Sequence, residues 1–240
     1  MPVYNEEATI NEIVDKVLAV VLSNDLAKEL IIVDDFSSDG SWAALQELAA
    51  QHQEITLVRH QKNRGKGAAI RTGLGHVSGD VIVIQDADLE YDPADYPKLL
   101  KPIEDGLADV VYGSRFMGET RRVFRLTHAV ANRFLTFMSN VVTGLNLTDM
   151  ETCYKMFKAD LVAGVELTAE RFGIEPELTA LFAKNGVRVY EVPISYAGRS
   201  YVAGKKIGVK DGIEAIYAIM KYNLFTPSPG KLPGKPSEDD

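Results

Sequence analysis

The stretch VIVIQDADLE, Val81 to Glu90, joins a short apolar run to three carboxylates. A β-branched apolar run of this kind is typical of a strand buried on both faces of a parallel sheet. Side chains alternate in extended backbone, so Asp86, Asp88 and Glu90 are expected to project to one side. Carboxylate oxygens are the ligands that Mg²⁺ and Mn²⁺ prefer, and open α/β sheets bind ligands at the carboxyl ends of their strands. The stretch predicts a metal and ligand site; the alternative is an acidic surface turn.

Strand and helix patterns alternate along the first half of the chain. Leu30 to Asp35 repeats the form of the first stretch, an apolar strand that ends in two carboxylates. Further strands are expected near Val3 and at 55–58 and 109–115, with helices at 6–21, at 42–48 and beginning near 68 and 93. Asn5 is expected to cap the first helix. The alternation predicts an α/β fold with a mostly parallel central sheet and helices on both faces.

A basic, glycine-containing loop at 60–67 leads directly into a predicted helix. Free backbone N–H groups and the positive end of a helix dipole make such a junction a natural anion site. The spacing is not that of a Walker loop, and a solvated basic loop is the alternative. Arg115 ends another predicted strand. Acidic and basic groups at one sheet edge predict a site for a metal-bound polyphosphate.

The second half of the chain is less regular. Arg121, Arg122 and Arg125 precede an amphipathic helix at 126–145, whose apolar face either covers the core or meets a membrane surface. A strand is expected at 187–196 and a last amphipathic helix at 209–224. Between them lies a basic loop at 198–206 that could fold over a bound anion. From Thr226 onward, prolines and terminal acids predict a disordered tail.

Composition narrows the function classes. A chain of 240 residues suits one α/β domain or two small ones. The net charge of −8 argues against a general nucleic-acid binder, whose affinity comes from basic patches on phosphate. The single Cys153 excludes an internal disulfide and suits a reducing compartment. No apolar run approaches the roughly 20 residues that span a bilayer. The expected location is the cytoplasm, with peripheral contact at the inner face of the membrane left open.

Four motifs carry a family resemblance. They are Pro2-Val3-Tyr4-Asn5-Glu6-Glu7, Val33-Asp34-Asp35-Phe36-Ser37-Ser38-Asp39-Gly40-Ser41, Arg64-Gly65-Lys66-Gly67-Ala68-Ala69 and Asp86-Ala87-Asp88-Leu89-Glu90. In this order they resemble the family-two inverting glycosyltransferases of the GT-A fold, a Rossmann-like nucleotide-diphospho-sugar transferase fold. The chain is most similar to the dolichyl-phosphate mannose synthases and related polyprenyl-phosphate hexosyltransferases. The resemblance implies one domain at 1–225, with a nucleotide-sugar-binding half at 1–115 and an acceptor-binding half at 116–225.

The resemblance also implies roles for the matching residues. A nucleotide-sugar would contact Pro2, Tyr4, Glu6, Asp34, Asp35, Arg64, Lys66, Asp86, Ala87 and Asp88. Mg²⁺ or Mn²⁺ would bind Asp88 and Glu90. Catalysis would use Asp88, Arg115, Arg125 and Arg199, with Arg115 and Arg125 receiving the acceptor phosphate and Arg199 lying over the donor.

The implied reaction moves a hexose, with inversion, from GDP-mannose or UDP-glucose to a polyprenyl phosphate. A phosphate acceptor is already ionised and needs no general base. The alternative is transfer to a sugar hydroxyl in polysaccharide or glycolipid synthesis, with Asp149, Glu175 or Glu177 as the base. A nucleotidyltransferase and a non-catalytic nucleotide-sugar-binding module are two further alternatives.

Overall fold

The computed structural model describes residues 1–23, 26–118, 126–198 and 209–227. The strands are β1 (Pro2–Val3), β2 (Leu30–Asp34), β3 (Ile55–Arg59), β4 (Val81–Val83), β5 (Val110–Ser114), β6 (Lys155–Lys158) and β7 (Val189–Pro193). The α-helices are α1 (Ile10–Ala19), α2 (Ser41–Gln51), α3 (Lys66–Leu74), α4 (Tyr96–Glu104), α5 (Leu126–Thr143), α6 (Ile174–Lys184) and α7 (Val209–Met220). Short 3₁₀ turns at Pro93–Asp95 and Ala159–Leu161 and a π-helical end at Lys221–Phe225 complete the described elements.

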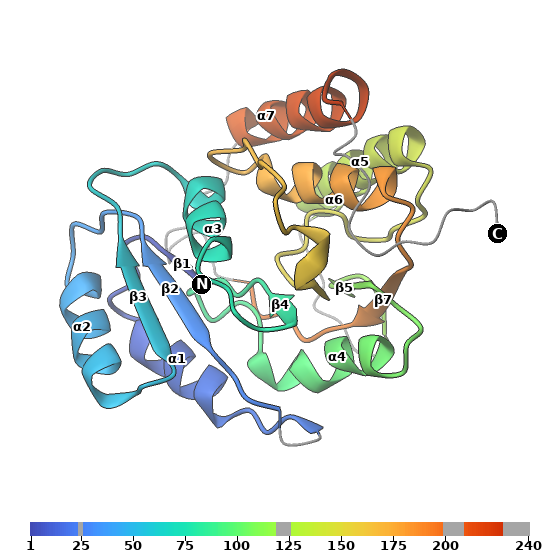
Figure 1. Ribbon diagram of the computed structural model, residues 1–240. Helices are drawn as coiled ribbons and strands as arrows, with labels where there is room; N and C mark the ends of the chain where they lie inside the picture. Colours follow the sequence, from blue (N-terminus) through green and yellow to red (C-terminus); the bar gives the residue numbers. More distant parts are fainter. Residues whose placement is uncertain (24–25, 119–125, 199–208, 228–240) are drawn as a thin grey trace.

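The strands form two sheets that lie next to each other (Figure 1). The first sheet, in the order β1-β2-β3, is parallel throughout. The second has the order β4-β6-β5-β7, and β6 runs antiparallel to both of its neighbours while β5 and β7 are parallel. The α/β prediction is confirmed, and the reversed strand β6 is the departure from a parallel arrangement. The ends of strands from the two sheets meet, so the segments that follow β2, β4 and β5 lie near one another.

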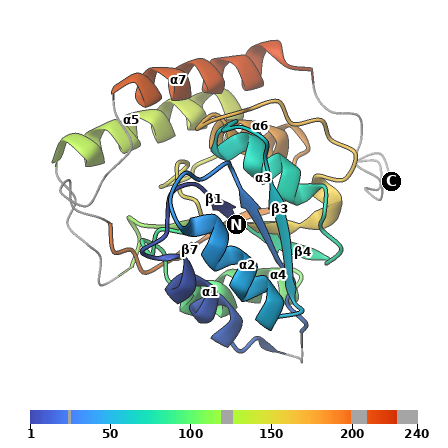
Figure 2. The same ribbon diagram turned by 90° about the vertical axis from the view of Figure 1, so that its left-hand side faces the viewer.

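Apolar periodicity explains how the helices attach. In α1 the buried residues are Ile10, Ile13, Val14 and Val17, which recur at helical spacing. Every residue of β2 and of β5 is buried, as expected for central strands. Helices α1, α2 and α4 lie at one end of the molecule, while α5, α6 and α7 gather at the other (Figure 2).

Two local expectations are wrong. The first helix begins at Ile10, and Asn5 instead adopts a positive φ of 54° and accepts a hydrogen bond from Ser38 N at 2.8 Å. The carboxylates after β4 do not sit on extended backbone, because the strand ends at Val83 and Leu89 has a φ of 59°. The chain therefore turns between Asp86 and Glu90, and their side chains take different partners.

Asp109 precedes β5 and connects it to groups at the ends of β6 and β7. We predict that its contribution to the stability of the fold depends on pH. Its carboxylate accepts hydrogen bonds from Arg188 Nη2 at 2.9 Å and Lys158 Nζ at 2.8 Å. Hydrogen bonding from Arg188, opposed by burial, lowers the pKa of Asp109 well below its usual range. A lowered folded-state pKa stabilises the fold above the unfolded-state pKa of about 4, and this stability is lost as the pH falls below that value. Asp109→Asn should lower the melting temperature by a few degrees at pH 7, and the difference should shrink toward pH 3. Thermal unfolding of both proteins at the two pH values checks this, and a pH-independent difference would contradict it.

Candidate functional site

Lys66 is the centre of a partly buried ion cluster at the junction of three segments. Its Nζ lies 2.9 Å from Asp86 Oδ1, in the turn after β4, and 3.0 Å from Glu175 Oε1, in the first turn of α6. Although burial opposes it, the neighbouring Asp86 and Glu175 carboxylates hold the pKa of Lys66 well above its usual value. The side chain is therefore a fixed positive charge between two carboxylates.

The two aspartates at the end of β2 brace the loops around this cluster. Asp34 is buried, lies 3.0 Å from Arg59 Nε and accepts hydrogen bonds from Ser37 N. Asp35 Oδ1 lies 2.7 Å from His60 Nδ1 and accepts the N–H of Arg64 at 2.8 Å, while its Oδ2 accepts that of Gly65 at 2.7 Å. Asp34 therefore holds the loop that follows β2, and Asp35 holds the backbone that leads into α3.

The anion site predicted on free amides before α3 is not formed. Gly67 N donates to Arg171 O at 3.2 Å, and Ala68 N donates to Glu170 O at 3.0 Å. The amides of the two preceding loop residues are taken by Asp35. Gly65 has a φ of 93°, and a Cβ there would lie 2.5 Å from Glu170 O. The glycines therefore serve the close approach of the 170–171 backbone.

Asp88 borders a pocket of about 800 Å³. The lining residues are Asn5, Glu6, Glu7, Ala8, Thr9, Asp39, Asp88, Leu89 and Ala197. Thr9 Oγ1 donates to Ala87 O at 2.8 Å, and Glu7 Oε2 accepts Gly40 N at 2.9 Å. These bonds join the chain before α1 to the turn after β4 and to the start of α2.

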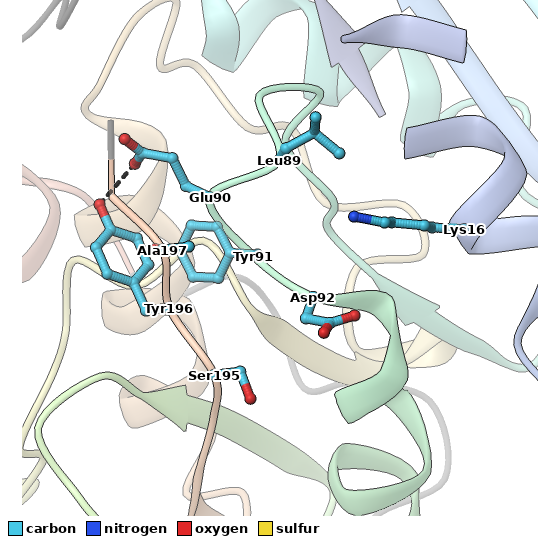
Figure 3. Close-up of a pocket in the computed structure, with 8 residues that line it drawn as sticks. All are labelled: Lys16, Leu89, Glu90, Tyr91, Asp92, Ser195, Tyr196 and Ala197. Atoms are coloured by element: carbon cyan, nitrogen blue, oxygen red, sulfur yellow. Dashed lines mark hydrogen bonds between the residues drawn. The ribbon is translucent and has the colours of Figure 1, made fainter. Parts of the chain in front are cut away.

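A smaller pocket of about 240 Å³ shares Leu89 and Ala197 with the first one (Figure 3). In it the side chains of Glu90 and Tyr196 point toward one another, and the Tyr196 hydroxyl donates to Glu90 Oε2 at 2.6 Å. Ala197 N also donates to Glu90 O at 2.8 Å. The segment after β7 therefore fixes the turn that carries Asp88.

The residues after β4 match the chemistry of a magnesium or manganese ligand set. Asp88 Oδ1 accepts Glu90 N at 3.2 Å, so the two residues predicted as metal ligands occupy one short turn. Within the described parts of the chain, no group of three or more His, Cys, Asp or Glu side chains converges on one point. Mg²⁺ is commonly held by one or two carboxylates together with substrate phosphates. Asp88, on the larger pocket, fits an ion whose coordination is completed by a diphosphate, whereas Glu90 lines the smaller pocket and accepts the Tyr196 hydroxyl.

Arg115, at the end of β5, forms a bidentate pair with Asp149. The distances are 2.7 Å from Nε to Oδ2 and 2.8 Å from Nη2 to Oδ1. Asn132 of α5 accepts from Arg115 Nη2 at 3.1 Å and donates to Asp149 Oδ1 at 3.1 Å. The guanidinium also lies 5.3 Å from the ring centre of Tyr196. Arg115 thus links α5 to the segment that fixes the Asp88 turn.

The three carboxylates considered as a base have different environments. Both oxygens of Glu177 are taken by backbone amides, Thr168 N at 2.7 Å and Ala169 N at 2.8 Å. Asp149 is fully occupied by Arg115 and its neighbours. Glu175 uses Oε1 for Lys66, whereas its buried Oε2 has no hydrogen-bond partner among the described residues.

The other predicted residues are dispersed around this site. Pro2 lies in β1, Glu6 lines the larger pocket, Tyr4 is 40% exposed, Arg64 is exposed and Ala87 is buried. Arg121, Arg122, Arg125, Arg199 and nearly all of the 198–206 loop lie outside the described residues, as does the tail from 228 onward. The sequence pattern missed the bracing role of Glu7 and the contact of Thr9, although Glu7 ends the Pro2–Glu7 motif and Thr9 lies two residues after it.

Comparison with known proteins identifies relatives along most of the chain. The undecaprenyl-phosphate 4-deoxy-4-formamido-L-arabinose transferase of Edwardsiella ictaluri is 28% identical over 228 residues, which are 95% of this chain and 67% of that protein. The corresponding transferase of Photorhabdus laumondii is 31% identical, covering 84% of this chain and 60% of its own. The dolichol-phosphate mannosyltransferase of Pyrococcus furiosus is 28% identical over 92% of this chain and 63% of its own. The chain thus spans about three fifths to two thirds of the length of these relatives.

Solved structures share the fold. Glucosyl-3-phosphoglycerate synthase from Mycobacterium tuberculosis, in complex with Mn²⁺, UDP and phosphoglyceric acid, superposes with a TM-score of 0.70 at 21% identity, covering 95% of this chain and 78% of that one. The GT-A fold prediction is confirmed. The family described as "Glycosyl transferase family 2" matches residues 1–165, which include β1 to β6 and the Lys66, Asp86 and Asp88 positions. The chain belongs to glycosyl transferase family 2.

Proposed function

We propose that this chain transfers a hexose from a nucleoside-diphosphate sugar, GDP-mannose or UDP-glucose, to a polyprenyl phosphate, with inversion at the anomeric carbon. The observation that carries the proposal is the Lys66–Asp86 pair, because it holds a cation beside Asp86, two residues before Asp88, and Asp88 lines the larger pocket. Three relatives named for undecaprenyl-phosphate or dolichol-phosphate transfer support the acceptor class. The donor belongs with residues 1–115 and the acceptor with residues 116–225.

The donor residues have separate roles in this proposal. The nucleoside would bind to Pro2, Tyr4, Glu6 and Asp35. The diphosphate would bind to Arg64 and Lys66. Breaking the sugar–phosphate bond places negative charge on the nucleoside diphosphate, and a preorganised Lys66 stabilises that charge without reorganising. Asp88 and Glu90 would hold Mg²⁺ or Mn²⁺, which neutralises part of the diphosphate charge when it is bound.

The acceptor phosphate attacks from the opposite face and needs no base, because it is ionised at neutral pH. Of the three arginines proposed for the acceptor side of the site, Arg115, at the boundary of the two halves, is the one the structure describes, and its Nη1 makes none of the described hydrogen bonds. Arg125 and Arg199 are proposed with it from the sequence motifs. The unpartnered Oε2 of Glu175 favours one alternative, transfer to a sugar hydroxyl with Glu175 as the base.

A donor panel separates these alternatives. Release of nucleoside diphosphate would be followed from GDP- and UDP-hexoses with Mg²⁺ or Mn²⁺, with and without a short polyprenyl phosphate. We expect release that requires both the ion and the lipid phosphate. Release with sugar acceptors, and none with the polyprenyl phosphate, would favour transfer to a sugar hydroxyl with Glu175 as the base. Pyrophosphate as the product would indicate a nucleotidyltransferase.

An exposed apolar face on α5 and α7 supports peripheral contact with the membrane that holds such an acceptor. On α5 the exposed apolar residues are Leu126, Val130, Phe134, Phe137 and Val141, and on α7 they include Ile213 and Tyr217. The two helices lie side by side (Figure 2). The interpretation that the α5 stripe covers the core is wrong, since the stripe faces solvent. In the described residues, no helix is both long and apolar enough to cross a bilayer.

Phe137→Glu should weaken binding to vesicles that contain anionic lipid by roughly tenfold, because it removes one apolar anchor and adds a charge. Phe137 is 63% exposed, so folding should be unaffected. Leu107→Glu is the matched control, being 50% exposed just after α4 at the other end of the molecule. Vesicle co-sedimentation checks this, and equal binding by both variants would contradict membrane contact through α5.

A further inference from the structure

The chain that follows β7 is fastened to the segment that follows β4 at the wall of the smaller pocket (Figure 3). Ser195 N donates to Asp95 Oδ2 at 2.6 Å, and Ala197 N donates to Glu90 O at 2.8 Å. Asp95 is buried, so its hydrogen bond is shielded from water. The backbone on both sides of Tyr196 is therefore held in place.

The Tyr196 side chain contacts groups on both proposed sides of the site. Its hydroxyl donates to Glu90 Oε2 at 2.6 Å, and the two side chains point toward one another in the smaller pocket (Figure 3). The guanidinium carbon of Arg115 lies over its ring, 5.3 Å from the ring centre. The ring of Tyr91 packs against it edge to face, with the ring centres 5.2 Å apart. This half-buried aromatic side chain thus joins the turn that carries Asp88 to the arginine proposed for the acceptor phosphate.

The hydroxyl of Tyr196 acts on Asp88 through one intervening residue. Glu90 N donates to Asp88 Oδ1 at 3.2 Å, so the carboxylate proposed as the ion ligand accepts a hydrogen bond from the residue that Tyr196 holds. Groups that orient a metal ligand through hydrogen bonds influence the affinity for the metal without touching it. Loss of the Tyr196 hydroxyl would therefore loosen the turn and weaken the binding of an ion at Asp88.

The ring of Tyr196 acts on Arg115 directly. Asp149 already holds the guanidinium through Nε and Nη2. A cation within about 6 Å of the centre of an aromatic face is attracted by the ring, so Tyr196 adds a second constraint on the same planar group. The remaining nitrogen, Nη1, makes none of the described hydrogen bonds. The ring and the carboxylate together fix the direction in which Arg115 can meet a phosphate.

We propose that Tyr196 is a positioning residue shared by the two sides of the site. Its hydroxyl sets the turn of Glu90 and Asp88 for the ion-bound diphosphate, and its ring sets Arg115 for the acceptor phosphate. This assignment rests on the proposed function, because it takes the two ligands to be a nucleoside diphosphate with its ion and a lipid phosphate. The two contacts use different parts of one side chain, so substitutions can separate them.

The test measures two affinities by calorimetry, one for GDP or UDP with Mn²⁺ and one for a short polyprenyl phosphate. Tyr196→Phe removes the hydroxyl and keeps the ring. We expect it to weaken the binding of nucleotide with Mn²⁺ by about tenfold, while the binding of nucleotide without Mn²⁺ and of the lipid phosphate stays unchanged. Tyr196→Leu also removes the ring, and it should in addition weaken the binding of the lipid phosphate by about fivefold.

Two controls separate positioning from a general effect on folding. Tyr190→Phe makes the same chemical change at a 44% exposed position of β7 and should alter neither affinity. In a Glu90→Ala background, Tyr196→Phe should cause no further loss, because the acceptor of its hydroxyl is already gone. Thermal unfolding of each variant shows that the compared proteins are folded. If Tyr196→Leu does not fold, Tyr196→Met makes the same comparison.

The outcomes separate this proposal from the proposed function. Unchanged or tighter binding of nucleotide with Mn²⁺ by Tyr196→Phe, or equal loss with and without Mn²⁺, would overturn the role of the hydroxyl even when the wild type transfers hexose to lipid. Equal binding of the lipid phosphate by Tyr196→Leu and the wild type would overturn the role of the ring. If the wild type binds nucleotide with Mn²⁺ but no lipid phosphate, the proposed acceptor fails and the role of the ring fails with it, while the Tyr196→Phe comparison still decides the role of the hydroxyl.

Discussion

Asp88→Asn should lower hexose transfer by roughly 100- to 1,000-fold while the protein stays folded. Asp88 is half-buried on the wall of the larger pocket, and its described hydrogen bond is accepted from Glu90 N, which an amide oxygen can also accept. The substitution therefore keeps the turn and removes the charge that would hold the divalent ion. Transfer rates at saturating Mn²⁺ and thermal unfolding of both proteins check this.

The matched control for that variant is Asp15→Asn, on the exposed side of α1. It makes the same chemical change away from the pocket and should leave transfer unaltered. If Asp88→Asn retained transfer within about threefold of the wild type, Asp88 would not be the principal ligand.

Lys66→Met should destabilise the fold by about 3 kcal/mol and also abolish transfer. The lysine is 18% exposed at its side chain and is paired with Asp86 and Glu175, so its removal leaves two carboxylates facing each other without a cation. Breaking a buried pair is costly for this reason, and the remaining exposure moderates the effect. Denaturant unfolding and transfer assays measure the two effects separately.

A second substitution distinguishes the stability effect from the catalytic one. Lys66→Met combined with Glu175→Gln removes one of the repelling charges and should recover part of the stability without recovering transfer. Lys101→Met breaks the exposed pair with Asp105 and should leave both quantities unchanged. A double variant that regained transfer together with stability would show that Lys66 acts only through folding.

The carboxylates at the ends of β2 and β4 were predictable, because apolar runs that stop at aspartates are a local signal. The conformation of the turn that carries Asp88 was not predictable from the local sequence pattern. Its positive-φ Leu89 depends on bonds from Thr9 and Ala197, which lie far away in the sequence. The amides at the start of α3 were likewise expected to be free, and those of Gly67 and Ala68 are taken by backbone at 170–171, about a hundred residues further on.

Two further features could not be predicted from the spacing of apolar residues. The α5 stripe has helical spacing whether it faces the core or solvent, and only the packed structure shows that residues such as Phe137 are exposed. Strand β6 was not predicted, because its sequence Lys-Met-Phe-Lys has only two apolar residues, and its antiparallel direction depends on the connection that precedes it.

The central claim is inverting transfer of a hexose to lipid phosphate at the Lys66–Asp88 edge. Its most direct test is to incubate labelled GDP-mannose or UDP-glucose with Mn²⁺ and a polyprenyl phosphate, extract the lipid, and determine the anomeric configuration of any lipid-bound hexose. We predict label in the lipid fraction with the configuration opposite to that of the donor, and none with Asp88→Asn. Retained configuration, or label only in water-soluble products, would contradict the account.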